Sequence, residues 1–540
     1  MDSKGVSRRD FLKGSALTAI GVAAGGLLGG CGKNSDISAS GQAEKAKLNF
    51  EKIPSSIPSA SIKERITADV VVVGAGISGV IAALSAQQAG ANTVVLQKGP
   101  CILTHGTAFG AIDTKLQKAA GVKINSVDAI SEFQYQCANK PNFELLRTWA
   151  QHSGETLDWI NEITAAQGGI GKFDATGSTD QGKKYWFNSF PTAHVWKGKV
   201  IGVATMIGKA AVHAGVQFYY KTPAVQLIRE KNGRVTGVVA KTETGEYKQF
   251  NAAKGVILCT GDYGSNPEMV EKYCPAAVGY QNYYTPRYNT GDGHRMGMWV
   301  GAAMEDAPHC KMTHVHSTPQ PGVGGDISGR AYPWLAVNHN GKRFINEDMP
   351  YAIMGNQVLR QPGGDGYFYQ IIDADWSSNP KQFSPRTAAA PLPEKAFEQG
   401  IKDGLIFKAN TLEELARVIK APAENLKATV KRYNELVDKG VDEDYGKLSC
   451  DLTPVKKAPF YAIPRLCCLS VTLGGLVINT KMQVLDKEKK VIPGLYAAGN
   501  ASGDFFSGAN DYPFALVAVS VGRAATFGRL AGQNAAVDKA

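Results

Sequence analysis

The chain of 540 residues is long enough for two domains of ordinary size, and its 44% hydrophobic and 20% charged residues are typical of a globular protein. Its formal net charge of +11 is diffuse, with no block of Lys and Arg interleaved with aromatics, which argues against nucleic-acid binding. The nine cysteines form no Cys-x-x-Cys pair, which excludes a sequence-local iron–sulfur or c-type haem site.

The first 31 residues have the pattern of an export signal. Arg8 and Arg9 precede an apolar Gly/Ala-rich stretch that ends near Leu28, and the pair resembles a twin-arginine signal, which carries folded proteins. The segment ending at Cys31 resembles a lipoprotein cleavage box, which would make this cysteine a lipid anchor. We therefore expect export to the periplasm or the outer face of the cytoplasmic membrane, with residues 32–62 as a flexible linker.

An apolar strand, a glycine-rich turn, a helix and a second apolar strand follow one another between residues 68 and 98, as a βαβ unit requires. Gly74 permits a tight turn, Gly76 lets the backbone approach a pyrophosphate, and Gly79 lets the helix pack closely on the strand. The N-terminus of the helix would face the phosphates. Gln97 stands where an acidic residue usually accepts hydrogen bonds from ribose, and its amide oxygen can still accept one. This pattern predicts a dinucleotide site.

Three further motifs follow the glycine turn in order, at residues 258–264, 290–293 and 492–500. Together the four resemble the single-chain flavoproteins of the fumarate reductase and 3-ketosteroid dehydrogenase superfamily, from about residue 65 to the C-terminus. The resemblance implies FAD as the redox centre. Some members bond FAD through a histidine near His105, but the local match is imperfect, so non-covalent binding is favoured. The expected FAD-binding residues are Gly74, Ala75, Gly76, Ser78, Gly79, Gln97, Lys98, Thr260, Gly261, Asp292, Gly499, Asn500, Leu516 and Val517.

The same resemblance implies an α/β fold in which a Rossmann-like FAD-binding domain is split in sequence around an inserted α+β catalytic (capping) domain. The expected parts are residues 63–270 and 455–540 for the FAD-binding domain and 271–454 for the insertion. The patterning agrees, because βαβ regularity is lost between Tyr273 and Leu452, whereas residues 255–258 and 491–498 have the pattern of sheet strands.

In fumarate-type members an arginine four residues after an Asn-Glu pair delivers the proton, and an arginine and a histidine bind the dicarboxylate. The corresponding positions here are Tyr351, Asp511 and Ser470. A dicarboxylate would lose two charge-assisted partners and meet an acid, a loss on the order of several kcal/mol. We therefore do not expect fumarate to be the substrate.

The tyrosines instead resemble those of ketosteroid dehydrogenases and enone-reducing flavoproteins, whose substrates are apolar with a single carbonyl. We expect hydride transfer from N5 of reduced FAD to the β-carbon of an activated double bond, with Tyr351 delivering the proton and Arg330 lowering the pKa of that tyrosine. Tyr461 or Tyr512, with a backbone N–H near Gly474, would stabilise charge on the carbonyl oxygen. The candidate catalytic residues are Tyr351, Arg330, Tyr461, Tyr512 and His316, which matches a substrate-facing histidine of the family.

The chain has neither a haem segment nor a recognisable FMN domain, so electrons must come from outside the polypeptide. We expect a membrane-bound multihaem cytochrome to supply them, which would make the protein a terminal reductase of anaerobic respiration. Two alternatives stay open at this point. One is a steroid-type dehydrogenase that desaturates its substrate, and the other is a non-catalytic flavin lipoprotein that relays electrons.

Overall fold

The computed structural model describes residues 48–175, 189–282, 288–316, 332–379, 383 and 392–539, with only the backbone of His316 and Tyr351. The expected export signal, the lipid-anchor cysteine Cys31 and Arg330 lie outside these residues. Within the described ranges, no helix is both long and apolar enough to cross a membrane.

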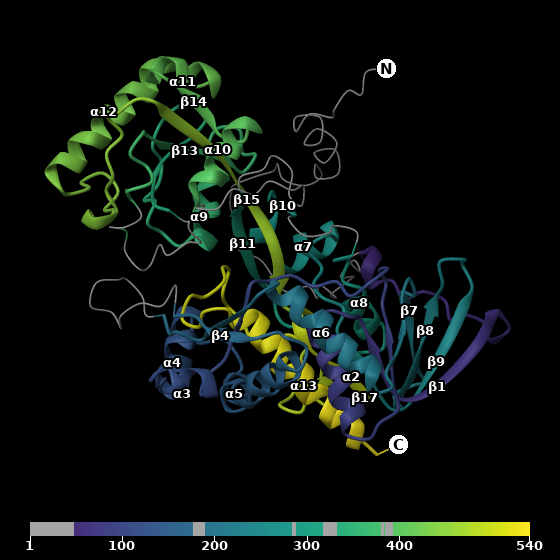
Figure 1. The fold of residues 1–540 in the computed structure, drawn as a ribbon. Helices are drawn as coiled ribbons and strands as arrows, with labels where there is room; N and C mark the ends of the chain where they lie inside the picture. The colour runs from purple at the N-terminus through teal and green to yellow at the C-terminus, as the bar shows by residue number, and fades with distance from the viewer. Residues whose placement is uncertain are drawn as a thin grey trace, which may run out of the picture. The chain divides into compact units, whose positions relative to one another are not determined.

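An eight-stranded sheet gathers strands from both ends of the chain (Figure 1). Its strands are β1 (Ile62–Val73), β2 (Thr93–Leu96), β6 (Gln217–Tyr219), β7 (Ala224–Arg229), β8 (Val235–Lys241), β9 (Tyr247–Leu258), β16 (Gln483–Leu485) and β17 (Val491–Ala497). The central order is β16-β17-β9-β1-β2-β6, and the pairs from β17 to β6 are all parallel. Because Leu495 of β17 pairs with Val256 of β9, the C-terminal segment completes the N-terminal sheet. The predicted Rossmann-like, sequence-split FAD-binding fold is confirmed.

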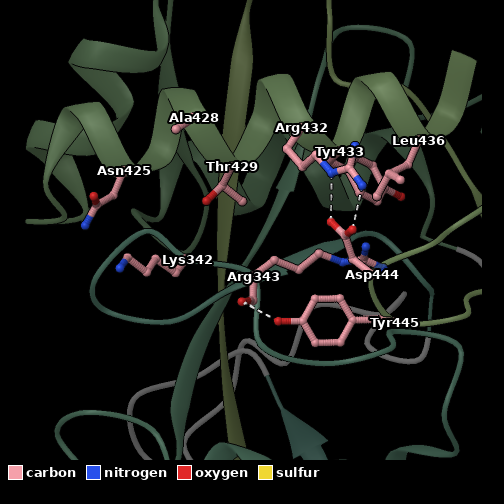
Figure 2. A pocket seen from close by; sticks show the side chains of 10 residues that line it. All are labelled: Lys342, Arg343, Asn425, Ala428, Thr429, Arg432, Tyr433, Leu436, Asp444 and Tyr445. Carbon is pink, nitrogen blue, oxygen red and sulfur yellow. Dashed lines mark hydrogen bonds and ion pairs between the residues drawn. The ribbon is translucent and has the colours of Figure 1, made fainter.

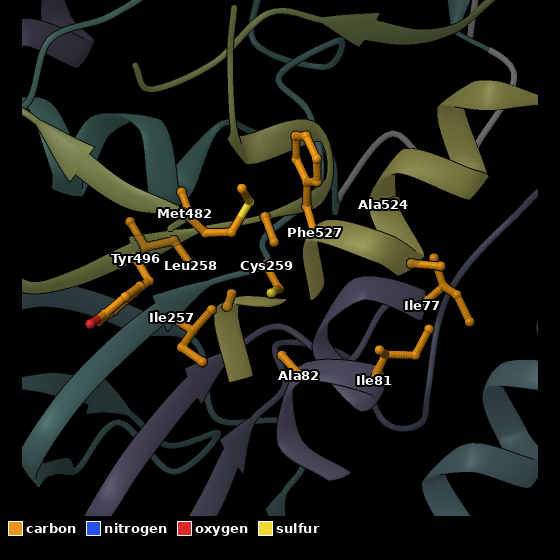
Figure 3. Packing of buried hydrophobic residues seen from close by; sticks show 14 of the residues in the cluster. Ile77, Ile81, Ala82, Ile257, Leu258, Cys259, Met482, Tyr496, Ala524 and Phe527 are labelled. Carbon is orange, nitrogen blue, oxygen red and sulfur yellow. The ribbon is translucent and has the colours of Figure 1, made fainter. Parts of the chain in front are cut away.

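Eight helices among the described residues belong to the same part of the molecule. They are α2 (Ile77–Gln88), α3 (Lys115–Ala119), α4 (Ser126–Gln136), α5 (Phe143–Ala165), α6 (Lys199–His213), α7 (Pro267–Tyr273), α8 (Asp292–Trp299) and α13 (Val519–Val537). Of these, α2, α8 and α13 pack on strands of this sheet. A Cβ added at Gly532 of α13 would lie 2.2 Å from the Ala82 carbonyl oxygen of α2, so these helices meet through their backbones. Figure 3 shows the adjoining apolar core, in which Ile81 of α2, Phe527 of α13 and Ile257 of β9 are buried.

A small antiparallel sheet follows the second parallel strand in sequence. It contains β3 (Ala108–Gly110), β4 (Gly171–Phe173) and β5 (Ala193–Trp196), in the order β3-β5-β4. Single 3-10 turns lie at Asn49–Glu51, Ser59–Ser61, Pro275–Ala277, Ser449–Asp451 and Gly499–Ala501. A Cβ at Gly110 would meet Val517 O at 2.8 Å, so this sheet lies against the segment that leads into α13.

A second, six-stranded sheet is centred on β15 (Phe460–Leu473). Its other strands are β10 (Gln281–Asn282), β11 (Cys310–His316), β12 (Leu335–Val337), β13 (Tyr367–Ile372) and β14 (Phe407–Ala409), with helices α9 (Tyr351–Val358), α10 (Glu394–Lys402), α11 (Leu412–Val418) and α12 (Ala423–Lys439). This is the capping domain. The strand β15 falls in residues 455–540, which the sequence analysis assigns to the FAD-binding domain, yet its pairing partners all belong to the second sheet. The boundary at 454 stays a prediction.

Candidate functional site

The glycine turn before α2 forms a cradle with one open side. Gly74 has a left-handed φ of +104°, and a Cβ there would lie 2.3 Å from Cys259 O. A Cβ at Gly79 would lie 1.9 Å from Gly74 O, whereas a Cβ at Gly76 would meet only Leu103 O at 3.6 Å. No side chain caps the first turn of α2, so its N–H groups and the positive end of its dipole face the open side. This geometry fits a pyrophosphate.

The end of β2 places Gln97 beside the same turn. Its Oε1 accepts hydrogen bonds from Ala75 N at 3.4 Å and Lys98 N at 3.1 Å, while Nε2 donates to Cys101 O at 2.9 Å. The Gln97 side chain therefore bonds the backbone of the glycine turn and that of the segment after β2, because an amide carries a donor as well as an acceptor. Gln97 Oε1 already accepts these two bonds, so the predicted bond from a ribose hydroxyl would be a third one to the same oxygen.

The expected cofactor residues Lys98 and Asp292 form an ion pair. Lys98 Nζ lies 2.9 Å from Asp292 Oδ2 and donates to Thr290 Oγ1 at 2.7 Å. Burial alone would raise the pKa of Asp292, but the charges and hydrogen bonds of Lys98 and Arg295 hold this pKa below its usual value. The Lys98–Asp292 ion pair therefore links the 290–293 motif to the end of β2.

The turn after β9 contributes an unused polar group. The Thr260 hydroxyl is buried and has no hydrogen-bond partner in the part of the chain that the structure describes. Glycine is required nearby, because a Cβ at Gly293 would lie 2.3 Å from Thr260 Oγ1. Gly261 has a φ of +76°, which turns the chain without a side-chain penalty. A buried hydroxyl without a partner is costly, so this position fits a polar group of a bound cofactor.

Two turns from the C-terminal half are joined by buried side chains. His294 Nε2 donates to Asn500 O at 3.2 Å and to Gly474 O at 3.3 Å. Burial lowers the pKa of His294 to about 4, so the ring is neutral near pH 7. Arg523, itself buried, donates from Nη2 to Asn500 Oδ1 at 3.0 Å. Gly499, with a φ of +64°, and Asn500 are therefore held in a fixed turn.

The last two expected FAD residues precede α13. Leu516 is buried and forms a parallel bridge with Phe190, and Val517 O accepts a hydrogen bond from Thr192 Oγ1 at 2.7 Å. The same segment places Tyr512, which is 7% exposed, against the start of α13. Its hydroxyl oxygen accepts a hydrogen bond from Ser520 N at 3.1 Å. Tyr512 thus caps the helix, and any bond to a substrate must use its remaining hydroxyl capacity.

His105 lies beside a tight backbone contact. The next residue, Gly106, has a φ of +115° and accepts a hydrogen bond from Val200 N at 3.3 Å. Burial lowers the pKa of His105 to about 4, so its ring is neutral near pH 7. Whether this histidine bonds FAD stays a prediction, with non-covalent binding favoured.

The backbone positions of His316 and Tyr351 lie on two elements that pack together. His316 ends β11 and Tyr351 begins α9. Between these elements Thr313 Oγ1 donates to Ala352 O at 2.8 Å, and both groups are buried. Arg330, the third residue of this expected group, lies outside the described residues.

Tyr461 does not join this group, which corrects the sequence-based expectation. It pairs with Ile372 near the start of β15 and packs edge-on against Phe397, with ring centroids 5.0 Å apart. Leu473, next to the Gly474 turn, is twelve residues further along the same strand. At about 3.3 Å per residue, that separation is roughly 40 Å. Tyr461 is a core residue of the capping domain and cannot share a carbonyl oxygen with the Gly474 turn.

A buried polar triad that the sequence analysis did not identify lies between β11, α9 and the loop 508–513. Lys311 pairs with Asp511, and its Nζ donates to Asn356 Oδ1 at 3.0 Å. Asn356 Nδ2 donates to Asp511 Oδ2 at 2.8 Å, which closes the triad. The Lys311 side chain is 0% exposed and that of Asp511 is 21% exposed. No sequence pattern indicated it, because β11 itself is a mixed polar and apolar strand and the three members lie in separate segments.

The family model described as "FAD binding domain" matches residues 69–513, most of the chain. The chain belongs to this FAD-binding family. It is 28% identical over 507 residues to the vinyl phenol reductase of Lactiplantibacillus plantarum, covering 87% of this chain and 96% of the relative. It is 30% identical to the urocanate reductase of Eggerthella lenta, covering 90% and 77% of the two chains. The open conformation of a flavocytochrome c3 fumarate reductase superposes with a TM-score of 0.71 at 26% identity, covering 88% and 79%.

As a member of this FAD-binding family, the protein is an FAD-dependent oxidoreductase that acts on carbon–carbon double bonds. The open face of Gly76, the free first turn of α2 and the partnerless Thr260 hydroxyl all fit FAD. When bound, FAD supplies hydride transfer, which no amino-acid side chain provides. The chain itself supplies the turns that would bind it.

A pocket of about 320 Å³ lies in the capping domain, between α12 and the loop that follows it (Figure 2). Its two arginines are already paired. Arg432 donates to both Asp444 carboxylate oxygens, and Arg343 contacts Glu347 and Asp442. None of the expected FAD-binding or catalytic residues lines this pocket. We therefore place the reaction at the turns described above.

Proposed function

We propose that the protein is an exported reductase that transfers hydride from FAD to an activated, enone-type double bond of an apolar substrate. Under this proposal a membrane-bound multihaem cytochrome supplies the electrons. One observation carries the choice of substrate class. The loop position that would bind a dicarboxylate holds Asp511, whose partner Lys311 is fully buried and committed to it.

The charge balance at this position disfavours fumarate. A substrate carboxylate placed there would face another carboxylate, because Lys311 cannot turn outward without leaving Asp511 unpaired. The second position holds Ser470, which is hydrogen-bonded to His314 of β11 and offers no charge of its own to a second carboxylate. Two of the relatives are named for the reduction of vinyl phenol and urocanate. Both names support a conjugated alkene as the substrate class.

In the proposed reaction the chain provides the proton and the charge stabilisation. Tyr351, the first residue of α9, is proposed as the proton donor. Arg330 is proposed as the neighbouring cation, and His316 as a contact to the substrate. Tyr512 stays a candidate donor to the carbonyl oxygen. Tyr461 is no longer part of the proposal.

The localisation and the electron donor are proposed from the N-terminal sequence and from the neighbour in which flavin and cytochrome occur together. A membrane-bound quinol-linked cytochrome would reach a protein that is anchored through Cys31 or is free in the periplasm. Membranes that contain such a cytochrome should accelerate turnover with the purified protein. Their failure to do so would leave the reductase chemistry standing and reject the donor.

The deciding experiment follows anaerobic reoxidation of the dye-reduced, FAD-loaded protein at the flavin band. The panel contains fumarate, cinnamates, 3-keto-4-ene steroids and simple aryl enones. We expect rapid reoxidation by bulky enones and none by fumarate, and we expect Tyr351→Phe to slow it by about 10²- to 10⁴-fold. Reoxidation by fumarate would contradict the substrate class. Reduction of an acceptor dye by a saturated ketone, without alkene reduction, would favour the desaturating direction.

A further inference from the structure

We propose that Asp511, held by Lys311 and Asn356, is a hydrogen-bond acceptor that selects substrates with a hydroxyl or N–H donor and rejects those with a carboxylate at that end. This inference rests on the proposed reductase function and names a chemical feature of its substrate. It assigns a specificity-determining role to a triad whose members come from three separate elements.

The triad lies where the elements of the proposed reaction meet. Lys311 and Asp511 face each other in a parallel bridge, and Lys311 N also donates to Asn510 O at 3.1 Å. Further along β11 is His316, and the loop of Asp511 continues into Tyr512. Asn356 follows Tyr351 by five residues in α9, a rise of about 7.5 Å. The triad therefore lies less than two helical turns from Tyr351 along α9.

Burial determines which charge of the ion pair can meet the substrate. The Lys311 side chain is wholly buried, and Asp511 is the member of the ion pair that remains partly exposed. A carboxylate can accept about four hydrogen bonds, and Asp511 accepts one from Lys311 on Oδ1 and one from Asn356 on Oδ2. Acceptor capacity therefore remains on its exposed side.

The environment of the triad favours a neutral donor. The charges of Lys311 and Asp511 cancel each other, and the lysine ammonium also lies 5.4 Å from the centre of the Tyr280 ring. A hydroxyl or N–H can donate to Asp511 without disturbing this arrangement. A carboxylate has no proton to donate and would be repelled at short range. A methoxy group keeps the oxygen but has no proton to donate, so it would leave the exposed acceptor capacity unused.

The test uses the full-length, FAD-loaded protein and aryl enones that differ in one substituent, hydroxyl, methoxy or carboxylate, at the para or meta position. Binding to the oxidised protein is measured by the perturbation of the flavin band, and turnover by reoxidation of the reduced protein. We expect the better hydroxyl isomer to bind about 10- to 100-fold more tightly than its methoxy analogue, because the bond is to a charged acceptor. The carboxylate should bind more weakly than either.

The double variant Lys311→Gln/Asp511→Asn removes both charges together, so that no buried ammonium is left unpaired. We expect the hydroxyl-to-methoxy preference to fall to within about 3-fold and the carboxylate penalty to shrink. The matched control is Asp375→Asn, an acid-to-amide change at an exposed pair with Lys457, which should keep the wild-type preference.

The outcomes separate this inference from the proposed function. Equal binding of the hydroxyl and methoxy compounds by the wild type would overturn the inference, even if all are reduced. Retention of the preference by the double variant would also overturn it. Selective binding of the hydroxyl compound without reduction of any enone would support the role of Asp511 while rejecting enone reduction. If the double variant fails to bind FAD, the relative binding of the hydroxyl, methoxy and carboxylate compounds to the wild type still tests the inference.

Discussion

The eight-stranded sheet and the six-stranded capping sheet are held together by different means. Around the first, backbones approach so closely that glycine is required, as at Gly74, Gly79 and Gly532. Around the second, buried charges are paired, as where Arg343 contacts the nearby Glu347 and the distant Asp442. The glycines of the turn before α2 stand in one short sequence motif, although the contacts of Gly74 and Gly532 reach distant segments. The pairing of Arg343 with Asp442 belongs to no such motif, so the two regions should fail differently when they are altered.

The largest expected effect is that of Gly79→Ala. Its Cβ would lie 1.9 Å from Gly74 O, a backbone atom that cannot move aside without disrupting the turn before α2. We expect a loss of about 3 kcal/mol or more in the free energy of unfolding, at the upper end of overpacking costs. FAD should be lost as well. Denaturant unfolding and the flavin-to-protein absorbance ratio measure the two effects.

The matched control is Gly76→Ala, which alters the same turn on its open side. Gly76 has a φ of −77°, which alanine adopts, and its Cβ would meet only Leu103 O at 3.6 Å. The apoprotein should keep its stability or gain about 0.4–1 kcal/mol, because alanine restricts the unfolded chain. FAD affinity should nevertheless fall. If both variants lose stability equally, close packing is not what distinguishes this turn.

The capping sheet should respond most to the loss of a charge. Arg343→Met leaves the Glu347 and Asp442 side chains, 1% and 0% exposed, without their main cation. Uncompensated buried charges cost about 3–5 kcal/mol, somewhat reduced here because Lys447 still lies 3.3 Å from Glu347. Denaturant unfolding should show the loss, while the protein in the absence of denaturant still binds FAD.

Arg432→Met makes the same change at an exposed pair in the same domain. Its side chain is 47% exposed, and it contacts Asp444 at 2.7 Å. We expect a loss of no more than about 1 kcal/mol, as is usual for surface pairs. Equal losses in the two variants would show that burial of the Arg343 network contributes nothing.

The same difference explains how far the sequence could be interpreted. The glycine turn, the strands ending at Leu258 and Ala497 and the FAD fold were predicted, because each depends on a short pattern. The Lys311 triad was not predicted, because its members are brought together only by the pairing of β11 with the loop 508–513. Tyr461 was misplaced because the strand β15 is almost entirely buried, so its apolar run gave no indication of which end lies near the flavin turns.

The pH dependence of stability should differ in sign between the two regions. Burial raises the pKa of Asp262, which follows β9, to about 7, although uncharged donors such as Gly264 N and Asn289 Nδ2 bond its carboxylate. In the capping domain, burial would raise the pKa of Asp442, but the hydrogen bonds and charge of Arg343 lower it to about 2. An unfolded aspartate has a pKa of about 3.9.

Between about pH 4 and 7 the folded protein therefore holds a proton on Asp262 that the unfolded chain lacks, so stability falls as pH rises, by at most about 1.4 kcal/mol per pH unit for one group. For Asp442 the sign is opposite, because its stabilisation is complete above about pH 4 and is lost as pH falls towards 2. Asp504, with its pKa raised to about 7, adds to the first window. Asp262→Asn should reduce the slope between pH 4 and 7 without abolishing it, and should leave the acid limb unchanged. Unfolding measured at half-unit pH intervals tests this, and an unchanged slope would mean that Asp262 keeps its charge within the fold.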